Sequence, residues 1–487
     1  MYSVLFFLKP IYSAFVQHYV PHITKGATMK KVILLSLLGF GLAAAQSVRL
    51  SVPYEQFTLK NGLHVILHVD RTTPTVSVNT WYHVGSGYEK PGRTGFAHLF
   101  EHLMFEGSGH VPEGKFDQWL EAAGGDNNAS TNDDRTNYWE NIPSNALELA
   151  LYLDSDRMGF LADSMTQKKL DGQRDVVKNE RRYSYENRPY GYADLMIDDA
   201  LFPPGHPYHW PTIGSMADLS AASLNDVKEF FHLYYAPNNA SLCIAGDIDV
   251  DKTKALVTKW FGDIPAGKPV PEQDRTVPVL NEEKRFTIED RVQLPRLYMA
   301  WISPAVLAPG DAQMDLLSNI LAGGKNSRLY KRLVYDLQIA QDVTAYQQSQ
   351  RIISEFDIIV TARAGHSLNE IEKIIQEEID KIKNEPPALR EVQRAQNQFE
   401  ANFVSRLERI GGFGGKADQL NNYYYLTGDP DYFNEDLARY FAADPGDVSA
   451  AARAYLKDHG RVVLSVVPKG KTDLAAKNSP VVSTEGK

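Results

Sequence analysis

The most informative stretch of this chain reads Gly95-Phe96-Ala97-His98-Leu99-Phe100-Glu101-His102-Leu103-Met104-Phe105-Glu106-Gly107. The pattern predicts a helix that begins near Gly95 and ends at Gly107, because glycine readily adopts the left-handed backbone found at helix ends. At 3.6 residues per turn, His98, Glu101 and His102 share one narrow face, and the rest of the circumference is mainly apolar. Such a helix belongs in a core, where polar side chains need partners. The His-x-x-Glu-His spacing therefore favours a metal ion.

The chemistry of these three residues points to zinc. Two histidines one turn apart can each present a nitrogen to one Zn²⁺, which takes about four ligands and keeps one position for water in catalytic sites. Glu101 can then act as general base toward that water. A third protein ligand must come from elsewhere, and Glu180 is the best candidate because it lies on the inward face of a helix predicted over 166–187. A histidine pair bonded only to backbone would leave Glu101 unexplained.

Composition excludes some classes of function and of metal site. The chain has 487 residues, of which 43% are hydrophobic, enough for more than one folded domain. A net charge of −10 argues against a general nucleic-acid binder, which needs a cationic surface. The single cysteine, Cys243, excludes an intrachain disulfide and a cysteine-rich zinc site, and we expect it to be a buried residue of a strand.

The first 45 residues have the pattern of an upstream segment followed by a signal peptide. Met29-Lys30-Lys31 is a positive region, 32–42 is apolar, and Ala43-Ala44-Ala45 offers a cleavage site. Either Met1 or Met29 can be the true start. The apolar run is too short for a spanning helix, so we expect an exported protein, periplasmic or secreted, without a stable membrane anchor.

The remaining chain predicts an α+β fold made of two homologous α/β-roll halves, each a mostly antiparallel sheet packed with helices. We place the halves at 46–268 and 286–475, with a proline-rich and charged linker at 269–285 and a polar tail at 476–487. The order of elements recurs after the linker, where a strand at 297–303 and a helix at 311–321 follow one another like the strand at 75–83 and the motif helix. The second copy lacks the motif.

Two polar segments of the first half need an interpretation. Asn61-Gly62 between alternating apolar residues predicts a hairpin, with His64 and His68 on its exposed face and about 13 Å apart, too far to share a metal. The stretch 127–139 is polar with short side chains. A strand there would be a sheet edge, and it can be either a solvated connection or a template for an extended peptide.

The motif helix together with Arg174-Asp175-Val176-Val177-Lys178-Asn179-Glu180-Arg181-Arg182 resembles the pitrilysin family, which includes insulysin, the mitochondrial processing peptidase and bacterial two-subunit zinc proteases. Segments 185–191, 206–208 and 235–240 are similar as well, so the resemblance covers about 54–467. It implies that His98, His102 and Glu180 bind one Zn²⁺ and that Glu101 is the base for hydrolysing unfolded peptides. It also implies a clamshell of α+β halves, with 46–268 the zinc-bearing peptidase domain, 286–475 an inactive domain, and Asn128 and Ala129 on the substrate-binding edge strand.

Two departures from the family pattern bear on activity. Gln173 stands where many relatives carry a second glutamate, so it predicts an uncharged group behind the metal ligands. An arginine and a tyrosine, seven residues apart in active members, align with Val334 and Gln341; Arg328 and Tyr335 have that spacing in a poorer register. We therefore expect the catalytic subunit of a heterodimer whose related partner carries the Arg/Tyr pair, or a homodimer. The alternative is a non-catalytic structural or peptide-binding subunit of the same fold.

Overall fold

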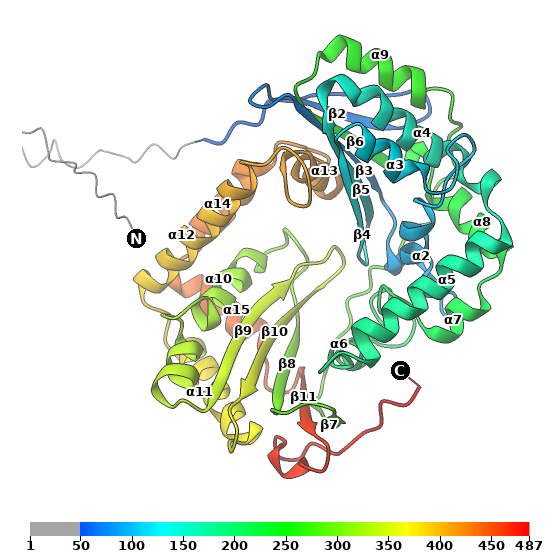
Figure 1. Cartoon of the computed structure of the whole chain (residues 1–487). Helices are drawn as coiled ribbons and strands as arrows, with labels where there is room; N and C mark the ends of the chain where they lie inside the picture. Colours follow the sequence, from blue (N-terminus) through cyan, green and yellow to red (C-terminus); the bar gives the residue numbers. More distant parts are fainter. Residues whose placement is uncertain (1–48, 487) are drawn as a thin grey trace, which may run out of the picture. The chain divides into compact units, whose positions relative to one another are not determined.

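The computed structural model describes residues 49–486 (Figure 1). The segment predicted to direct export lies outside the described residues. The chain divides into the units 1–49 and 50–487, and the helices and strands of the described residues all belong to the second unit. Within the described residues, none of the helices is both long and apolar enough to span a membrane.

The first sheet has six strands, and its hydrogen-bonded order is not the order of the sequence. Only the β2–β6 pair is parallel, and the predicted hairpin forms the antiparallel β1–β2 pair. β4 lies at one edge, as expected for a polar strand. The order across the sheet is β1 (Glu55–Thr58), β2 (His64–Val69), β6 (Ala240–Gly246), β3 (Thr75–Tyr82), β5 (Thr136–Pro143) and β4 (Asp126–Thr131).

Helices of the first half cover one face of this sheet and carry the motif. Alternate residues of β2 and β3, such as Val65 and Val78, pack against α2, α4, α8 and α9 in one core. The elements are η1 (Ser86–Tyr88), α2 (Phe96–Leu103), α3 (Lys115–Ala122), η2 (Ser144–Ala146), α4 (Leu147–Ser164), α5 (Gln167–Arg181), η3 (Arg182–Glu186), α6 (Ala193–Leu201), α7 (Met216–Ala221), α8 (Leu224–Tyr234), η4 (Pro237–Asn239) and α9 (Val250–Phe261).

The second sheet repeats the strand order of the first without a counterpart of β1. Its one parallel pair, β7–β11, occupies the place of β2–β6. The order is β7 (Lys284–Asp290), β11 (Arg461–Pro468), β8 (Arg296–Ser303), β10 (Ser354–Ala362) and β9 (Ala340–Gln348). The predicted α+β fold with two similar, mostly antiparallel halves is confirmed.

Most helices of the second half pack in its own core, and one run of them was not predicted. The sequence predicts helices at 311–321, 329–337 and 368–384, which correspond to α10, η5 and α11, whereas α12 to α15 come from the long stretch before the last strand. The elements are α10 (Asp311–Ala322), η5 (Tyr330–Asp336), α11 (Leu368–Asn384), α12 (Leu389–Arg406), α13 (Lys416–Thr427), α14 (Phe433–Ala442), α15 (Pro445–Tyr455) and η6 (Thr472–Leu474).

One helix of each half packs against the sheet of the other half. α6 contacts β8 and β11, and its Ile197 lies in a core with Ile288 and Leu464. α13 contacts β3 and β6, and its Leu420 packs with Ile66 and Cys243. Residues 262–283 connect the halves without a helix or strand of their own. Each half therefore contributes one helix to the core of the other half. The predicted domain limits stay a proposal.

Two local predictions were wrong. α2 ends at Leu103 rather than at Gly107, whose left-handed backbone (φ 80°) lies in the turn after the helix. His68 is not a surface residue: it is 4% exposed, and its Nδ1 lies 2.7 Å from the carbonyl oxygen of Pro53. The reason is that residues from the second half cover this side of the sheet, where the ring of Tyr424 stacks on His64 at 3.8 Å.

Candidate active site

The start of the motif helix is fixed by a glycine and a buried carboxylate. Gly95 adopts a left-handed backbone (φ 87°), and a Cβ there would lie 2.7 Å from the carbonyl oxygen of Ile213. Glu89 accepts hydrogen bonds from the amides of Gly95 and Ala97 at 2.8 and 2.7 Å. These amides open the helix and have no partner within it. Burial raises the pKa of Glu89 well above its ordinary value. The first turn of α2 is thereby held in place.

Three side chains from α2 and α5 converge on one point. The Nε2 atoms of His98 and His102 lie 3.4 Å apart. α5 packs against α2 and places Glu180 3.6 Å from His98 Nε2 and 3.2 Å from His102 Nε2. Tetrahedral zinc with bonds of 2.0–2.1 Å would separate its ligand atoms by about 3.3 Å. Across residues 49–486 this is the one group of three such side chains close enough to hold a metal ion.

The protonation of His98 and of Glu180 suits a metal. Burial, reinforced by the nearby His102, lowers the pKa of His98 to about 4, so its imidazole is neutral at pH 7. The hydrogen bond from His102 holds the pKa of Glu180 below its ordinary value, so its carboxylate is ionised. Neutral imidazole and ionised carboxylate are the forms that coordinate a metal.

Glu101 lies beside this group and is held from the other side. Thr131, the last residue of β4, donates its hydroxyl hydrogen to Glu101 Oε2 at 2.6 Å. Burial raises the pKa of Glu101 above its ordinary value, which makes its carboxylate a stronger base. The sequence did not single out Thr131. Its only signal was a place in the polar stretch expected to form an edge strand.

The edge strand contains both residues predicted to bind substrate. β4 pairs with β5 on one side only and contacts α2. Asn128 is exposed and its side-chain Oδ1 accepts the amide hydrogen of Ala129 at 2.8 Å. This local bond satisfies a backbone donor that an incoming strand would otherwise use. The edge is thus available beside Glu101, with one amide capped by its own neighbour.

Comparison with known proteins decides the family. Residues 64–200 match the model described as insulinase (peptidase family M16), and residues 221–399 match the peptidase M16 inactive domain. The chain belongs to peptidase family M16. The zinc protease PqqE of Helicobacter pylori is 29% identical over 89% of this chain and 98% of the relative.

Solved M16 structures share the fold. A crystal structure of a protease from Helicobacter pylori has a TM-score of 0.79 and 28% identity, and covers 85% of this chain and 99% of that one. The periplasmic protease PqqL from Escherichia coli, at 18% identity, has a TM-score of 0.71. The similarity covers 88% of this chain and 49% of PqqL, so this M16 chain corresponds to about half of that protein.

Gln173 contacts a different partner from the one expected in an M16 site. Its amide donates to Glu106 Oε1 at 2.7 Å. No hydrogen bond joins it to His98, His102 or Glu180 within the described part of the chain. Burial raises the pKa of Glu106. This hydrogen bond links α5 to the turn after α2 and involves none of the three residues of the metal group.

The arginine and tyrosine positions of the second M16 half are not arranged for a substrate. Arg328 makes a two-pronged ion pair with Glu391, with Nε and Nη2 each 2.8 Å from a carboxylate oxygen. Tyr335 is 73% exposed. Val334 packs against the second core, and Gln341 is an exposed residue of β9. The geometry therefore favours neither pair.

A cavity of about 190 Å³ beside η3 contains a cluster that the sequence did not reveal. Burial raises the pKa of Asp133 to about 6 and that of Asp357 to about 8, and raises the pKa of Glu355 well above its ordinary value. The five acidic side chains that line it are Asp133, Asp194, Asp198, Glu355 and Asp357. They are far apart in sequence, so no local pattern could predict the cluster.

Proposed function

We propose that this chain is a zinc metalloendopeptidase that hydrolyses unfolded peptides. His98, His102 and Glu180 would hold one Zn²⁺, and Glu101 would be the general base. The observation that carries the proposal is the convergence of three side chains: the two histidine Nε2 atoms lie 3.4 Å apart, and the Glu180 carboxylate lies 3.6 Å from His98 through Oε1 and 3.2 Å from His102 through Oε2. Glu101 lies on the same helix face as the histidines. Relatives named zinc proteases support the choice of metal.

The positions of the residues support a separate role for each group in the proposed reaction. Zinc, when bound, lowers the pKa of water to about 7 and polarises the carbonyl group of the scissile bond. Glu101, with its raised pKa, takes a proton from the attacking water and passes it to the leaving amine nitrogen. Thr131 holds the Glu101 carboxylate in one orientation through its hydrogen bond. The free edge of β4 binds the substrate backbone as an added strand.

We further propose that the chain works with a second subunit. Arg328 is occupied by Glu391, and Val334 and Gln341 cannot replace an arginine and a tyrosine. A related chain carrying that pair would complete the site. A homodimer is the alternative assembly, but a second copy of this chain brings no such pair. The length of PqqL, about twice the region shared with this chain, agrees with a need for two such units. Export to the periplasm or beyond remains part of the proposal.

A second candidate function is a non-catalytic structural or peptide-binding subunit. The observation that favours it is the absence of a usable Arg/Tyr pair at the aligned positions of the described chain, together with the match of 221–399 to a domain described as inactive. In this case zinc would still bind, but no peptide would be cleaved by any pairing of subunits. The two candidates thus differ in turnover.

The test combines metal analysis with a quenched fluorescent peptide. The mature chain and its Glu101→Gln variant should each contain one zinc per chain. With a related partner that carries the Arg/Tyr pair, the variant should cleave at least about 10²-fold more slowly than wild type. The matched control is Glu121→Gln, which changes an exposed glutamate of α3.

Three outcomes would contradict parts of the proposal. An unchanged rate in Glu101→Gln removes Glu101 as base. Full activity of the chain by itself removes the need for a partner. Zinc binding without turnover in any combination selects the non-catalytic alternative.

A further inference from the structure

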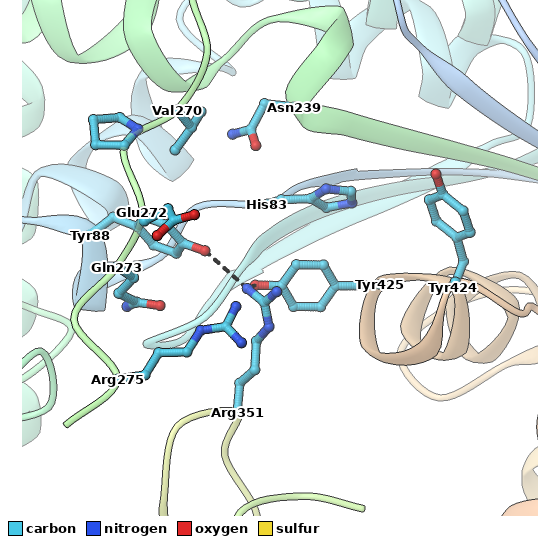
Figure 2. A pocket seen from close by; sticks show the side chains of 12 residues that line it. His83, Tyr88, Asn239, Val270, Glu272, Gln273, Arg275, Arg351, Tyr424 and Tyr425 are labelled. Carbon is cyan, nitrogen blue, oxygen red and sulfur yellow. Dashed lines mark hydrogen bonds between the residues drawn. The ribbon is translucent and has the colours of Figure 1, made fainter. Parts of the chain in front are cut away.

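A cavity of about 820 Å³ lies where the two halves and their connection meet (Figure 2). His83 and Tyr88 come from the first half, where they follow β3 and belong to η1 respectively. Residues 270–275 belong to the connection. Arg351 and Tyr425 come from the second half. The cavity uses no residue of the metal group, so what it binds is independent of the proposed peptidase site.

Two arginine side chains line this cavity, one from the connection and one from the second half. In the view of Figure 2, Arg275 and Arg351 both extend toward its interior. Arg351 Nη1 donates to the hydroxyl oxygens of Tyr88 and Tyr425 at 3.1 and 3.0 Å, and its guanidinium lies over the Tyr425 ring. Within residues 49–486, neither arginine has a carboxylate within 4.0 Å, although Glu272 also lines the cavity.

The remaining walls offer neutral polar and aromatic groups. Burial, followed by the charge of Arg351, lowers the pKa of His83 to about 3, so its ring is uncharged. The amide of Gln273 donates to the carbonyl oxygen of Gly87 at 2.8 Å. The charged side chains that line the cavity are therefore two arginines and one glutamate. Asp134, outside the lining, accepts the backbone amide hydrogen of Arg351 at 2.9 Å and, against the effect of burial, its charge helps to raise the pKa of that arginine.

We propose that this cavity binds an oxyanion with at least two negative charges, either a tetrahedral phosphate or sulfate group or a dicarboxylate. Two positive charges that line one cavity without an ion pair repel each other, and an anion bound between them reverses the sign of that interaction. Guanidinium groups bind such oxygens with two parallel hydrogen bonds, which makes arginine the usual residue for this purpose. The tyrosine bonds already orient Arg351 for it.

The position of the site gives the ligand a structural effect. Its walls come from before, within and after residues 262–283, so a bound anion links the connection to both halves. A ligand that binds only the folded chain raises its unfolding temperature as the ligand concentration increases. It should also slow cleavage of the connection at Glu272 by an added glutamate-specific protease.

The experiment measures binding of sulfate and of succinate to the mature chain by calorimetry, at constant ionic strength maintained with chloride. We expect saturable binding of at least one anion, and the stronger one identifies the tetrahedral or the dicarboxylate class. Arg275→Gln should weaken it by at least about tenfold, because Arg275 is exposed and its loss removes one of the two charges without disturbing packing. Arg351→Lys, which keeps the charge but loses the planar fork, should also weaken it.

Two controls keep the site separate from other anion-binding surfaces. Arg390→Gln changes an exposed arginine of α12 and should bind as wild type does. Glu101→Gln should also bind normally, because the metal group is not involved. Absence of saturable binding of either anion, or equal affinity in Arg275→Gln and wild type, would overturn the proposal.

Discussion

α2 and α10 occupy the same place in the two halves but are built for different purposes. Each follows a glycine with a left-handed backbone, Gly95 at φ 87° and Gly310 at φ 98°. Counted from these glycines, His98, Glu101 and His102 correspond to Gln313, Leu316 and Leu317. The two leucines are at most 1% exposed and lie in the second core. The fold therefore does not require polar residues on this face.

The difference shows that the polar face of α2 serves function rather than stability. Burying two imidazoles and a carboxylate costs free energy unless each has a partner, whereas leucine at the same positions gains free energy from burial. His98 Nδ1 is buried without a hydrogen-bond partner among the described residues, which is one such cost. α10 shows that the same element can be built with an apolar face.

The strands β5 and β10 also occupy corresponding places in the two sheets, and they differ in how their buried acidic residues are paired. On β5, Glu140 is fully buried and paired with Arg157 at 2.6 Å. On β10, the corresponding strand of the second sheet, Glu355 and Asp357 are both buried, with no such ion pair between residues 49 and 486. β5 therefore pairs its buried acid with a base, whereas β10 contributes two buried acids to a cavity.

Replacing His102 of α2 by leucine, the residue at the corresponding position of α10, should have the largest effect on zinc content and hydrolysis. His102→Leu removes a metal ligand, so we expect complete loss of bound zinc and of hydrolysis, measured by metal analysis and a peptide assay. Without metal, the variant should be at least as stable as wild type, because leucine suits this core position. The reverse change, Leu317→His, buries an unpartnered polar ring and should reduce the free energy of unfolding by about 2–4 kcal/mol. A destabilised His102→Leu chain would contradict the comparison.

A smaller effect is expected from Thr131→Val, which keeps the side-chain shape and removes the hydrogen bond to Glu101. A carboxylate that is free to rotate is a less effective base, so kcat should fall by about tenfold while zinc content and KM stay unchanged. The control Thr344→Val changes an exposed threonine of β9. Equal kcat for both variants would show that Thr131 has no part in positioning Glu101.

A further prediction concerns pH and the acids on β10, and it tests folding stability instead of activity. Burial raises the pKa of Asp357 to about 8, above its value of about 4 in an unfolded chain. Between these values the folded state binds more protons than the unfolded state, so the free energy of unfolding should fall as the pH rises from about 4 to about 8. Denaturant unfolding at a series of pH values should show this slope in wild type and a shallower slope in Asp357→Asn. Parallel curves would show that the cavity does not hold a proton at neutral pH.

The sequence predicted the parts of the site that depend on helical periodicity. His98, Glu101, His102 and Glu180 could be found because each lies on one face of a predicted helix. The alternation of apolar residues likewise predicted most strands and the repeat of two halves. These features depend on neighbours within a few residues along the chain, and those neighbours are visible in the sequence.

Features that depend on distant segments could not be predicted in this way. His68 was expected on the surface because the helix that covers its side of the sheet comes about 350 residues later in the chain. The acidic cavity brings Asp133 together with Glu355, and the anion cavity brings His83 together with Arg351. Thr131 was in a predicted strand, but its contact with Glu101 depends on how that strand approaches α2.

α6 and α13 each pack on the sheet of the other half, and this affects how the chain can fold during synthesis. When the ribosome has completed the first half, Ile66 and Cys243 still lack the helix that covers them, because α13 has not been made. The first sheet is therefore left with an exposed apolar face, which favours aggregation until the rest of the chain is present. Neither half should be obtainable as a well-behaved separate protein, and the native state forms only after nearly the whole chain is available. Such a late completion is compatible with passage across a membrane before folding.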